Sequence, residues 1–112
     1  GIPLVTATSI EAGLPCVFIR NAKKDYGTAK KLEGVVNEGD HVVVLEDVAT
    51  TGGQVLEAVE TLRQLGAQVT AVISTIDRLS GARENIEAAG VEYDTLFTVH
   101  DLGIDPVVED AG

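Results

Sequence analysis

A short apolar run from Val42 to Leu45 is followed directly by two acids and then by a loop of threonine and glycine. The run reads Val-Val-Val-Leu, which has a strong propensity for a buried strand. Glu46 and Asp47 come next, and Thr50-Thr51-Gly52-Gly53 then leads into a helical pattern that begins near Gln54. A strand, an acid pair, a small loop and a helix start in this order favour an α/β fold built around this segment.

The same order of residues favours a binding site. The loop can surround an anionic group with backbone N–H donors that a helix N-terminus directs toward it. Glu46 and Asp47 would repel a phosphate, so they need another partner, such as sugar hydroxyls or a bound cation. A ligand that carries both a phosphate and a vicinal diol fits best. The alternative interpretation is a solvated turn after a strand.

The helix expected after this loop has a clear apolar face, and Gly66 can end it. The residues of that face are Val55, Leu56, Val59, Leu62 and Leu65. Glu57, Glu60 and Arg63 take the opposite side. Val69 to Ile76 is a second strongly apolar strand. A strand, a helix and a strand with short connections predict a right-handed crossover in a parallel sheet.

Weaker patterns predict the remaining regular elements. A helix is expected from Pro3 to Ala12, with Gly13 just past its end. Leu14 to Ile19 is expected to be a short buried strand that ends at Arg20. Ser80 could cap a helix that runs through Ala89 and closes at Gly90. Tyr93 to Val99 predicts the last strand.

Residues 21–40 contain three glycines and show no sustained helical period. A connection of this length without regular structure is usually a functional lid or disordered. Five of the eight basic residues lie within the twelve positions from 20 to 31: Arg20, Lys23, Lys24, Lys30 and Lys31. This concentration of positive charge favours a lid that closes on a site for an anion. A solvated, charged loop is the alternative.

Composition excludes several classes of protein. The 112 residues, 45% of them hydrophobic, predict one folded domain, residues 1–112. The net charge of −10 argues against general binding to nucleic acid or to an anionic membrane. No apolar run reaches the ~20 residues that span a bilayer. The single cysteine, Cys16, is expected to be a buried residue in a reducing cytoplasm.

The predicted strands place polar groups at their carboxyl ends: Arg20, Glu46-Asp47 and Asp77-Arg78. Open α/β sheets bind ligands at that edge, so we expect the three groups to converge on one site. Asp77-Arg78 could also be a plain ion pair at a strand end. The glycines lack the Lys-Ser/Thr of a nucleotide-binding P-loop and the third glycine of a dinucleotide fingerprint, and no Cys/His cluster has metal-ligand spacing.

The stretch from Val42 to Gly53 resembles the phosphoribosyl-diphosphate signature of the type I phosphoribosyltransferases, in which two acids and a threonine-rich loop follow an apolar strand. Within that family the resemblance is closest to the orotate phosphoribosyltransferases and runs over nearly all of residues 1–103. Three further segments carry it: Gly1-Ile2-Pro3-Leu4, Arg20 to Gly27 followed by Leu32-Glu33-Gly34, and Asp77-Arg78. It implies an open, three-layer α/β fold with a parallel sheet.

The resemblance also implies a reaction: ribose 5-phosphate passes from phosphoribosyl diphosphate to orotate, which gives orotidine 5′-phosphate and diphosphate in pyrimidine biosynthesis. Mg²⁺ would be the cofactor, bound through the substrate diphosphate and not by direct protein ligands. The protein would be a cytoplasmic homodimer without nucleic-acid or membrane partners. Two other functions stay open: a regulatory module that binds phosphoribosyl diphosphate without catalysis, and a purine phosphoribosyltransferase.

Matching positions receive the roles of the family. Glu46 and Asp47 would hold the ribose hydroxyls, and Arg78, with Thr50 nearby, would contact orotate. Arg20 and Lys24 would reach the diphosphate, Arg20 from a neighbouring subunit, and the loop 21–34 would close over the site. The residues implied in catalysis are Arg20, Lys24 and Asp47. Those implied in binding phosphoribosyl diphosphate are Arg20, Lys24, Tyr26, Glu46, Asp47, Val48, Ala49, Thr50, Thr51, Gly52, Gly53 and Gln54.

Two lid positions depart from the family pattern, which often has Lys in place of Asn21 and His in place of Tyr26. Lys23 can partly replace the lost cation, and Tyr26 can donate a hydrogen bond but carries no positive charge near neutral pH. The family's N-terminal hood, its first strand and a lysine just before Gly1 are expected to be absent from this chain. Those parts shape the orotate pocket and part of the dimer contact in the family.

Overall fold

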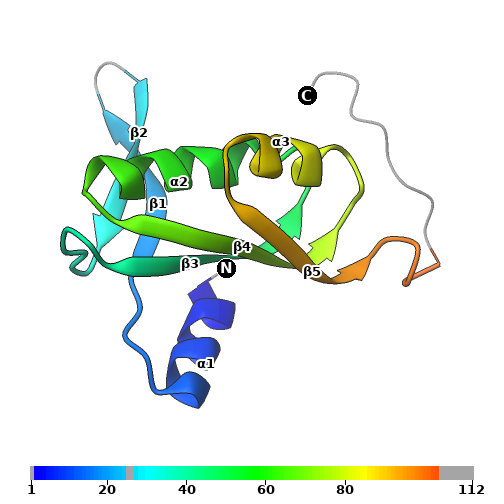
Figure 1. Cartoon of the computed structure of the whole chain (residues 1–112), viewed down its shortest axis with the longest axis horizontal. Helices are drawn as coiled ribbons and strands as arrows, with labels where there is room; N and C mark the ends of the chain where they lie inside the picture. Colours follow the sequence, from blue (N-terminus) through cyan, green and yellow to red (C-terminus); the bar gives the residue numbers. More distant parts are fainter. Residues whose placement is uncertain (1, 25–26, 104–112) are drawn as a thin grey trace.

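The computed structural model describes residues 2–24 and 27–103. Three parallel strands form its central sheet in the order β3-β4-β5: β3 (His41–Ala49), β4 (Gln68–Asp77) and β5 (Glu92–Thr98). Helix α2 (Gly53–Gln64) connects β3 to β4, and α3 (Ala82–Ala88) connects β4 to β5 (Figure 1). The predicted α/β class, with consecutive strands joined through helices in a parallel sheet, is confirmed.

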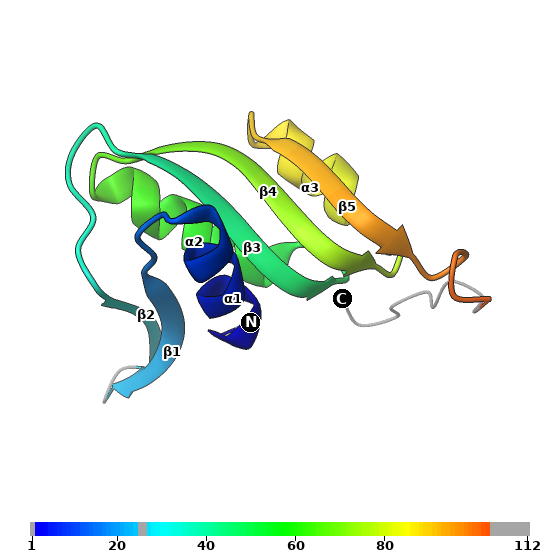
Figure 2. The same ribbon diagram turned by 90° about the horizontal axis from the view of Figure 1, so that it is seen from below.

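Helices lie on both faces of this sheet. Helices α2 and α3 share one face, and α1 (Ile2–Ala12) lies on the other face beside β3 (Figures 1 and 2). The core lies between the sheet and the α2–α3 layer, where small and β-branched side chains let the helices approach the strands closely. Its buried residues are Ala49, Val55, Val59, Val72, Ala82, Ile86, Val91 and Tyr93.

The predicted apolar face of α2 is largely confirmed. Val59 and Leu62 are each only 1% exposed, whereas Leu65, which lies just beyond the helix, is 43% exposed. Gly66 follows with a φ of +88°, a left-handed conformation that glycine adopts without steric cost. The helix therefore ends where the sequence predicts, and its last predicted apolar residue does not contribute to the core.

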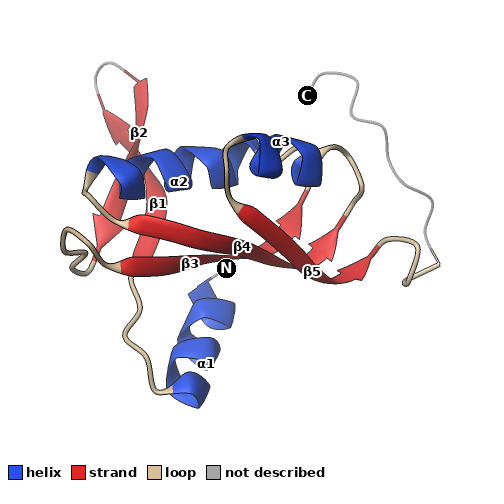
Figure 3. Ribbon diagram, viewed as in Figure 1, coloured by secondary structure: helices blue, strands red, loops and turns tan. Residues whose placement is uncertain are grey.

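The first strand pair corrects the prediction of a long irregular segment. Strands β1 (Phe18–Lys24) and β2 (Gly27–Glu33) pair antiparallel, from Phe18 opposite Glu33 to Lys24 opposite Gly27, and form a separate two-stranded sheet (Figure 3). The expectation that residues 21–40 lack regular structure is therefore wrong for residues 21–24 and 27–33, and it is confirmed for residues 34–40. Backbone pairing between two strands needs no alternating apolar pattern, so lysine-rich segments can form it.

The buried strand predicted from Leu14 to Ile19 is also largely wrong. Strand β1 begins only at Phe18, Leu14 is 64% exposed and Cys16 is exposed rather than buried. Pro15 has no backbone N–H to give to a sheet, which is one reason why pairing starts after it. A short apolar run does not by itself show whether other elements of the fold will pack against it and bury it.

The other elements follow the sequence with small differences. Helix α1 confirms the predicted helix, and Gly13 follows it with a φ of +69°. Helix α3 begins at Ala82 after Gly81, whose left-handed backbone precedes the first turn, and no side chain caps it. The predicted cap at Ser80 is therefore wrong. Within residues 2–24 and 27–103, none of the helices combines the length and apolar character needed to cross a bilayer.

Replacing Leu62 by Ala should lower the free energy of unfolding by about 2–5 kcal/mol, because the change removes buried methyl groups and leaves a cavity between α2 and the sheet. Leu65→Ala is the matched control, since Leu65 is already half exposed, and should cost less than about 1 kcal/mol. Urea unfolding of both variants measures the difference. Equal losses would contradict this description of the core.

Candidate functional site at the carboxyl edge of the sheet

The three parallel strands end together. Ala49, Asp77 and Thr98 are opposite one another at the last paired positions of β3, β4 and β5. The N–H of Arg78 donates to the carbonyl of Ala49 at 2.9 Å, and the N–H of Val99 donates to the carbonyl of Asp77 at 3.0 Å. These bonds extend the strand pairing by one residue, so the loops that follow all leave from one edge.

The acid pair lies within β3 and not after it, because the strand continues to Ala49. This corrects the prediction that the strand stops at Leu45. Glu46 is half-buried, and its Oε1 accepts the N–H of Asp47 at 3.0 Å. Asp47 is exposed. The structure thus places two carboxylates just before the edge, that of the half-buried Glu46 and that of the exposed Asp47.

The threonine-glycine loop turns from β3 into α2, and α3 supports it from behind. Gly52 is buried with a φ of +88°, and a Cβ built on it would lie 3.4 Å from the Cα of Ala82. The side-chain amide of Asn85 donates to the carbonyl of Thr51 at 2.8 Å. Sequence reasoning missed Asn85, because nothing in a pattern of local spacing connects two residues that lie 34 positions apart.

The N-terminus of α2 follows this loop directly, and its partial positive charge suits an anion. The helix has no acid in its first turn, and no side-chain hydrogen bond caps it at Gly52. Its carbonyl at Gly52 accepts the N–H of Leu56 at 2.9 Å, which starts the helix. A twelve-residue helix presents its first N–H groups and the positive end of its dipole here.

The remaining residues of the predicted loop differ in what they can offer a ligand. Ala49 is buried in the core, so its methyl group supports the loop from within. Val48 is half exposed in β3, Thr50 and Thr51 are half-buried, and Gly53 and Gln54 are exposed in the first turn of α2. Glu46 to Gln54 therefore comprise the end of β3, a short turn over residues 50–52 and the start of α2, all at the same edge of the sheet.

Strand β4 contributes Asp77 and Arg78 to the same edge. Asp77 is 3% exposed, and its Oδ1 accepts the N–H of Leu79 at 2.8 Å. Leu79 has a φ of +60°, which is uncommon for a residue other than glycine. Arg78 lies between them, half-buried and bonded through its N–H to Ala49. The loop after β4 is therefore connected to the end of β3 that carries the acid pair.

The predicted cations of the lid lie elsewhere. Arg20 and Lys24 belong to β1, in the separate hairpin, and Tyr26 lies outside the described residues. Both ribbon views place the hairpin toward the end of the sheet at which β3 begins, whereas the threonine-glycine loop follows the other end (Figures 1 and 2). The prediction that Arg20 ends a strand at the same edge as Glu46 and Arg78 of its own chain is wrong.

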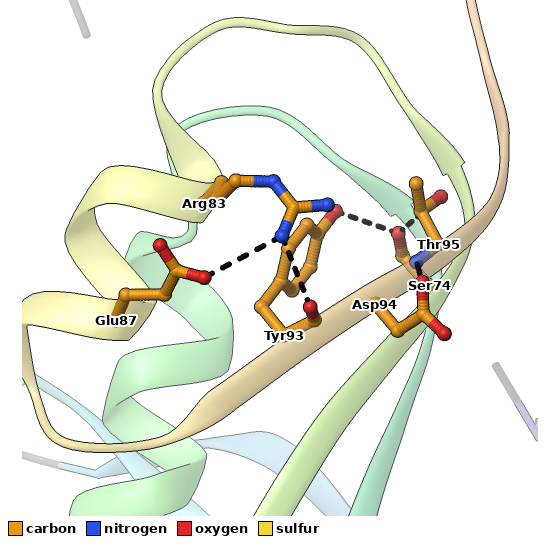
Figure 4. Close-up of polar contacts among 6 residues, drawn as sticks. All are labelled: Ser74, Arg83, Glu87, Tyr93, Asp94 and Thr95. Atoms are coloured by element: carbon orange, nitrogen blue, oxygen red, sulfur yellow. Dashed lines mark hydrogen bonds and ion pairs between the residues drawn. The ribbon is translucent and has the colours of Figure 1, made fainter.

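A buried set of hydroxyl groups supports the sheet behind this edge (Figure 4). Ser74, the neighbour of Glu46 on β4, lies 2.7 Å from the Tyr93 hydroxyl and donates to the Thr95 hydroxyl at 3.0 Å. The Arg83 guanidinium lies 5.1 Å from the centre of the Tyr93 ring and donates to the Tyr93 carbonyl at 3.2 Å. Burial raises the pKa of Tyr93, and the Asp77 carboxylate adds to that rise.

Within the described ranges, no three His, Cys, Asp or Glu side chains gather closely enough to hold a metal ion. A hard cation such as Mg²⁺ takes most of its ligands from water and phosphate oxygens when a protein offers only one or two carboxylates. Glu46 and Asp47 could therefore contribute to a metal site only together with a bound ligand.

Comparison with known proteins assigns the chain to a family. Residues 1–97 match the phosphoribosyl transferase domain. The chain belongs to the phosphoribosyltransferase family. Orotate phosphoribosyltransferase of Natronomonas pharaonis is 48% identical over 101 residues, which are 90% of this chain and 58% of that protein. The chain thus spans little more than half the length of the curated relatives it matches.

Solved structures agree with this assignment. The crystal structure of orotate phosphoribosyltransferase from Aeropyrum pernix matches with a TM-score of 0.81 and 32% identity, over 92% of this chain and 60% of that one. A Mycobacterium tuberculosis orotate phosphoribosyltransferase in complex with 5-phospho-α-D-ribosyl 1-diphosphate matches with a TM-score of 0.62 and 40% identity, over 65% and 45% of the two chains. The fold is therefore that of the phosphoribosyltransferases.

Gly52→Ala should lower the free energy of unfolding by about 1–3 kcal/mol, because an alanine is strained in the left-handed backbone that Gly52 adopts at a φ of +88°. Gly53→Ala is the control, since Gly53 has no positive φ and a Cβ there meets only the Thr51 hydroxyl at 3.7 Å. Thermal or urea unfolding measures both. A Gly52→Ala chain as stable as Gly53→Ala would contradict the turn described for this loop.

The hydroxyl of Tyr93 should titrate above its ordinary pKa of 10.0, because the buried site disfavours the anion. The contribution of the buried, neutral Tyr93 hydroxyl to the free energy of unfolding is fully present at pH values below about 10. It is lost as the pH rises through the higher pKa of Tyr93 in the folded chain. Tyrosinate absorbance in a Tyr26→Phe chain, which leaves Tyr93 as the remaining tyrosine, measures the shift. Titration at the ordinary value while the chain stays folded would contradict it.

Proposed function

We propose that this chain forms the catalytic core of an orotate phosphoribosyltransferase, which transfers ribose 5-phosphate from phosphoribosyl diphosphate to orotate. The products are orotidine 5′-phosphate and diphosphate. The observation that supports this most is the sheet edge itself: an acid pair, a glycine turn at a helix N-terminus and an arginine on the next strand lie on three connected segments. The named relatives agree with it.

Each part of the edge suits one part of the substrates. The turn from Thr50 to Gly53 offers backbone N–H groups and a helix dipole to the 5-phosphate. Glu46 and Asp47 can accept hydrogen bonds from the ribose 2- and 3-hydroxyls. Arg78 leaves the edge one strand away, where its guanidinium can pair with the orotate carboxylate, and Thr50 lies at the same edge.

The chemistry requires separated charges. As the bond from the ribose to diphosphate breaks, positive charge develops on the sugar, which the carboxylates of Glu46 and Asp47 can stabilise. Negative charge develops on the departing diphosphate and requires cations. Arg20 and Lys24 would provide them from the hairpin of a neighbouring subunit, because the hairpin of the same chain lies toward the far end of the sheet. The active unit would accordingly be a homodimer.

A Mg²⁺ ion fits this arrangement as a partner of the substrate. The diphosphate and ribose oxygens, together with water, would supply its ligands, so that the ion is bound through the substrate and not by direct protein ligands. Bound there, the ion would neutralise charge on the leaving diphosphate. The reaction would take place in the cytoplasm, which agrees with a chain that has one cysteine and therefore no internal disulfide.

Incubation with orotate, phosphoribosyl diphosphate and Mg²⁺ should consume orotate, which is followed by its absorbance. Arg78→Ala should raise the KM for orotate by roughly tenfold to a hundredfold, because a charged hydrogen-bond partner of the substrate is lost. The KM for phosphoribosyl diphosphate should change less than about twofold. Arg63→Ala is the control, since Arg63 lies in the last turn of α2, away from the edge.

The assay also separates the other functions. Binding of phosphoribosyl diphosphate by calorimetry without turnover, in this chain and in one extended to the length of its relatives, would refute the enzyme and favour a regulatory module. Consumption of a purine in place of orotate, with purines competing against orotate, would favour purine transfer. An equal loss for both substrates in Arg78→Ala would refute the role assigned to Arg78.

A further inference from the structure

The last residue of β4 is a buried acid that has no role in the proposed reaction. Asp77 is the last residue of β4, and its carboxylate accepts the N–H of Leu79 at 2.8 Å. Its side chain is almost fully enclosed, and Asp77 and Ser74 are the two buried polar residues of the described core. A buried carboxylate costs free energy unless hydrogen bonds compensate it, so this position is demanding for an acid.

The residue that Asp77 bonds has an unusual backbone. Leu79 has a φ of +60°, and it is the one residue other than glycine with a positive φ in the described chain. A leucine in the left-handed region costs about 1–2 kcal/mol relative to the right-handed one. The hydrogen bond from its N–H to Asp77 opposes that cost, because the carboxylate reaches the N–H two residues on only if the chain turns there.

Arg78 lies between these two residues and has little backbone freedom as a result. Its N–H is bonded to the Ala49 carbonyl, and the preceding carbonyl, that of Asp77, accepts the N–H of Val99. The turn on the other side of Arg78 is held by the bond from Leu79 to Asp77. Fixed backbone on both sides limits the directions in which an arginine side chain can leave the sheet edge.

We propose that Asp77 is a positioning residue for the acceptor base: it holds the Arg78–Leu79 turn so that the Arg78 guanidinium meets the carboxylate of the acceptor. This inference rests on the proposed function for the identity of the acceptor, but the turn itself can be tested without activity. Asp77 acts through the backbone and would not touch the substrate.

The neighbouring strand provides a matched control. Asp101 follows β5 and accepts the N–H of Thr98 at 2.8 Å, so it closes a turn at the same edge with the same chemistry. It differs from Asp77 in three respects: it is exposed, it accepts the N–H of a residue that precedes it and not of one that follows it, and it belongs to the loop after β5 and not to the turn that carries Arg78. Its removal should affect its own turn and leave acceptor binding unchanged.

The test compares Asp77→Ala, Asp77→Asn and Asp101→Ala in the whole chain with orotate, phosphoribosyl diphosphate and Mg²⁺. Asp77→Ala should raise the KM for orotate about tenfold and change the KM for phosphoribosyl diphosphate less than about twofold. Asp77→Asn keeps an oxygen that can accept the Leu79 N–H, so it should stay within about threefold of the parent chain. Asp101→Ala should match the parent chain.

A second measurement needs no turnover. Hydrogen exchange at the Leu79 amide should accelerate at least about tenfold in Asp77→Ala and remain slow in Asp77→Asn and Asp101→Ala. The urea midpoint of each variant reports whether it is folded, and Asp77→Asn, which conserves shape, tests the inference if Asp77→Ala unfolds. In that case Asp77→Asn must keep both the slow exchange and the KM for orotate.

Several results would overturn the inference. They are an unchanged KM for orotate in folded Asp77→Ala, an equal rise for both substrates, or an Asp77→Asn chain that loses the protection of the Leu79 amide. Failure of the proposed function looks different: the parent chain, and the same chain extended to the length of its relatives, would turn over no orotate. The exchange of the Leu79 amide would then still decide whether Asp77 holds the turn, and the role in acceptor binding would be refuted along with the reaction.

Discussion

The parallel pairing of β3 with β4 is the interaction on which the described structure depends. It places Ala49 opposite Asp77 and continues into the bond from the Arg78 N–H to the Ala49 carbonyl. Parallel strands need a crossover, and α2 supplies it with a face that buries Val59 and Leu62. Because both strands then end at one edge, Ala49 and Asp77, which are 28 positions apart in the chain, are neighbours there.

Negative charge at that edge would oppose the binding of the proposed phosphoribosyl substrate. Glu46 and Asp47 on β3, Asp77 on β4 and Asp101 after β5 add negative charge to one side of the sheet. A ligand with three phosphate groups is repelled by such an edge unless N–H dipoles, cations and metal ions offset the charge. The helix α2 N-terminus offers the dipole, and the basic hairpin and Mg²⁺ are the proposed sources of the rest.

The sequence predicted the crossover and the residues of the turn, because both have local signals: the apolar run at Val42, the spacing from Val55 to Leu62, and Gly52. It failed for β1 and β2, because strands rich in lysine have no apolar alternation. It also failed for Cys16, which lies exposed where an apolar run suggested a covered strand. Whether an apolar run is covered depends on distant elements, which local patterns do not describe.

The contacts between α3 and the turn at residues 50–52 are an example of such long-range interactions at the site. Gly52 approaches the Ala82 Cα closely because neither residue has a large side chain, and the Asn85 amide then reaches the Thr51 carbonyl. This bond gives the Thr51 carbonyl a hydrogen-bond partner on α3, 34 positions away in the chain. Helix α3 therefore does more than cover the sheet, because it contacts the turn at Gly52 and bonds the backbone of that turn at Thr51.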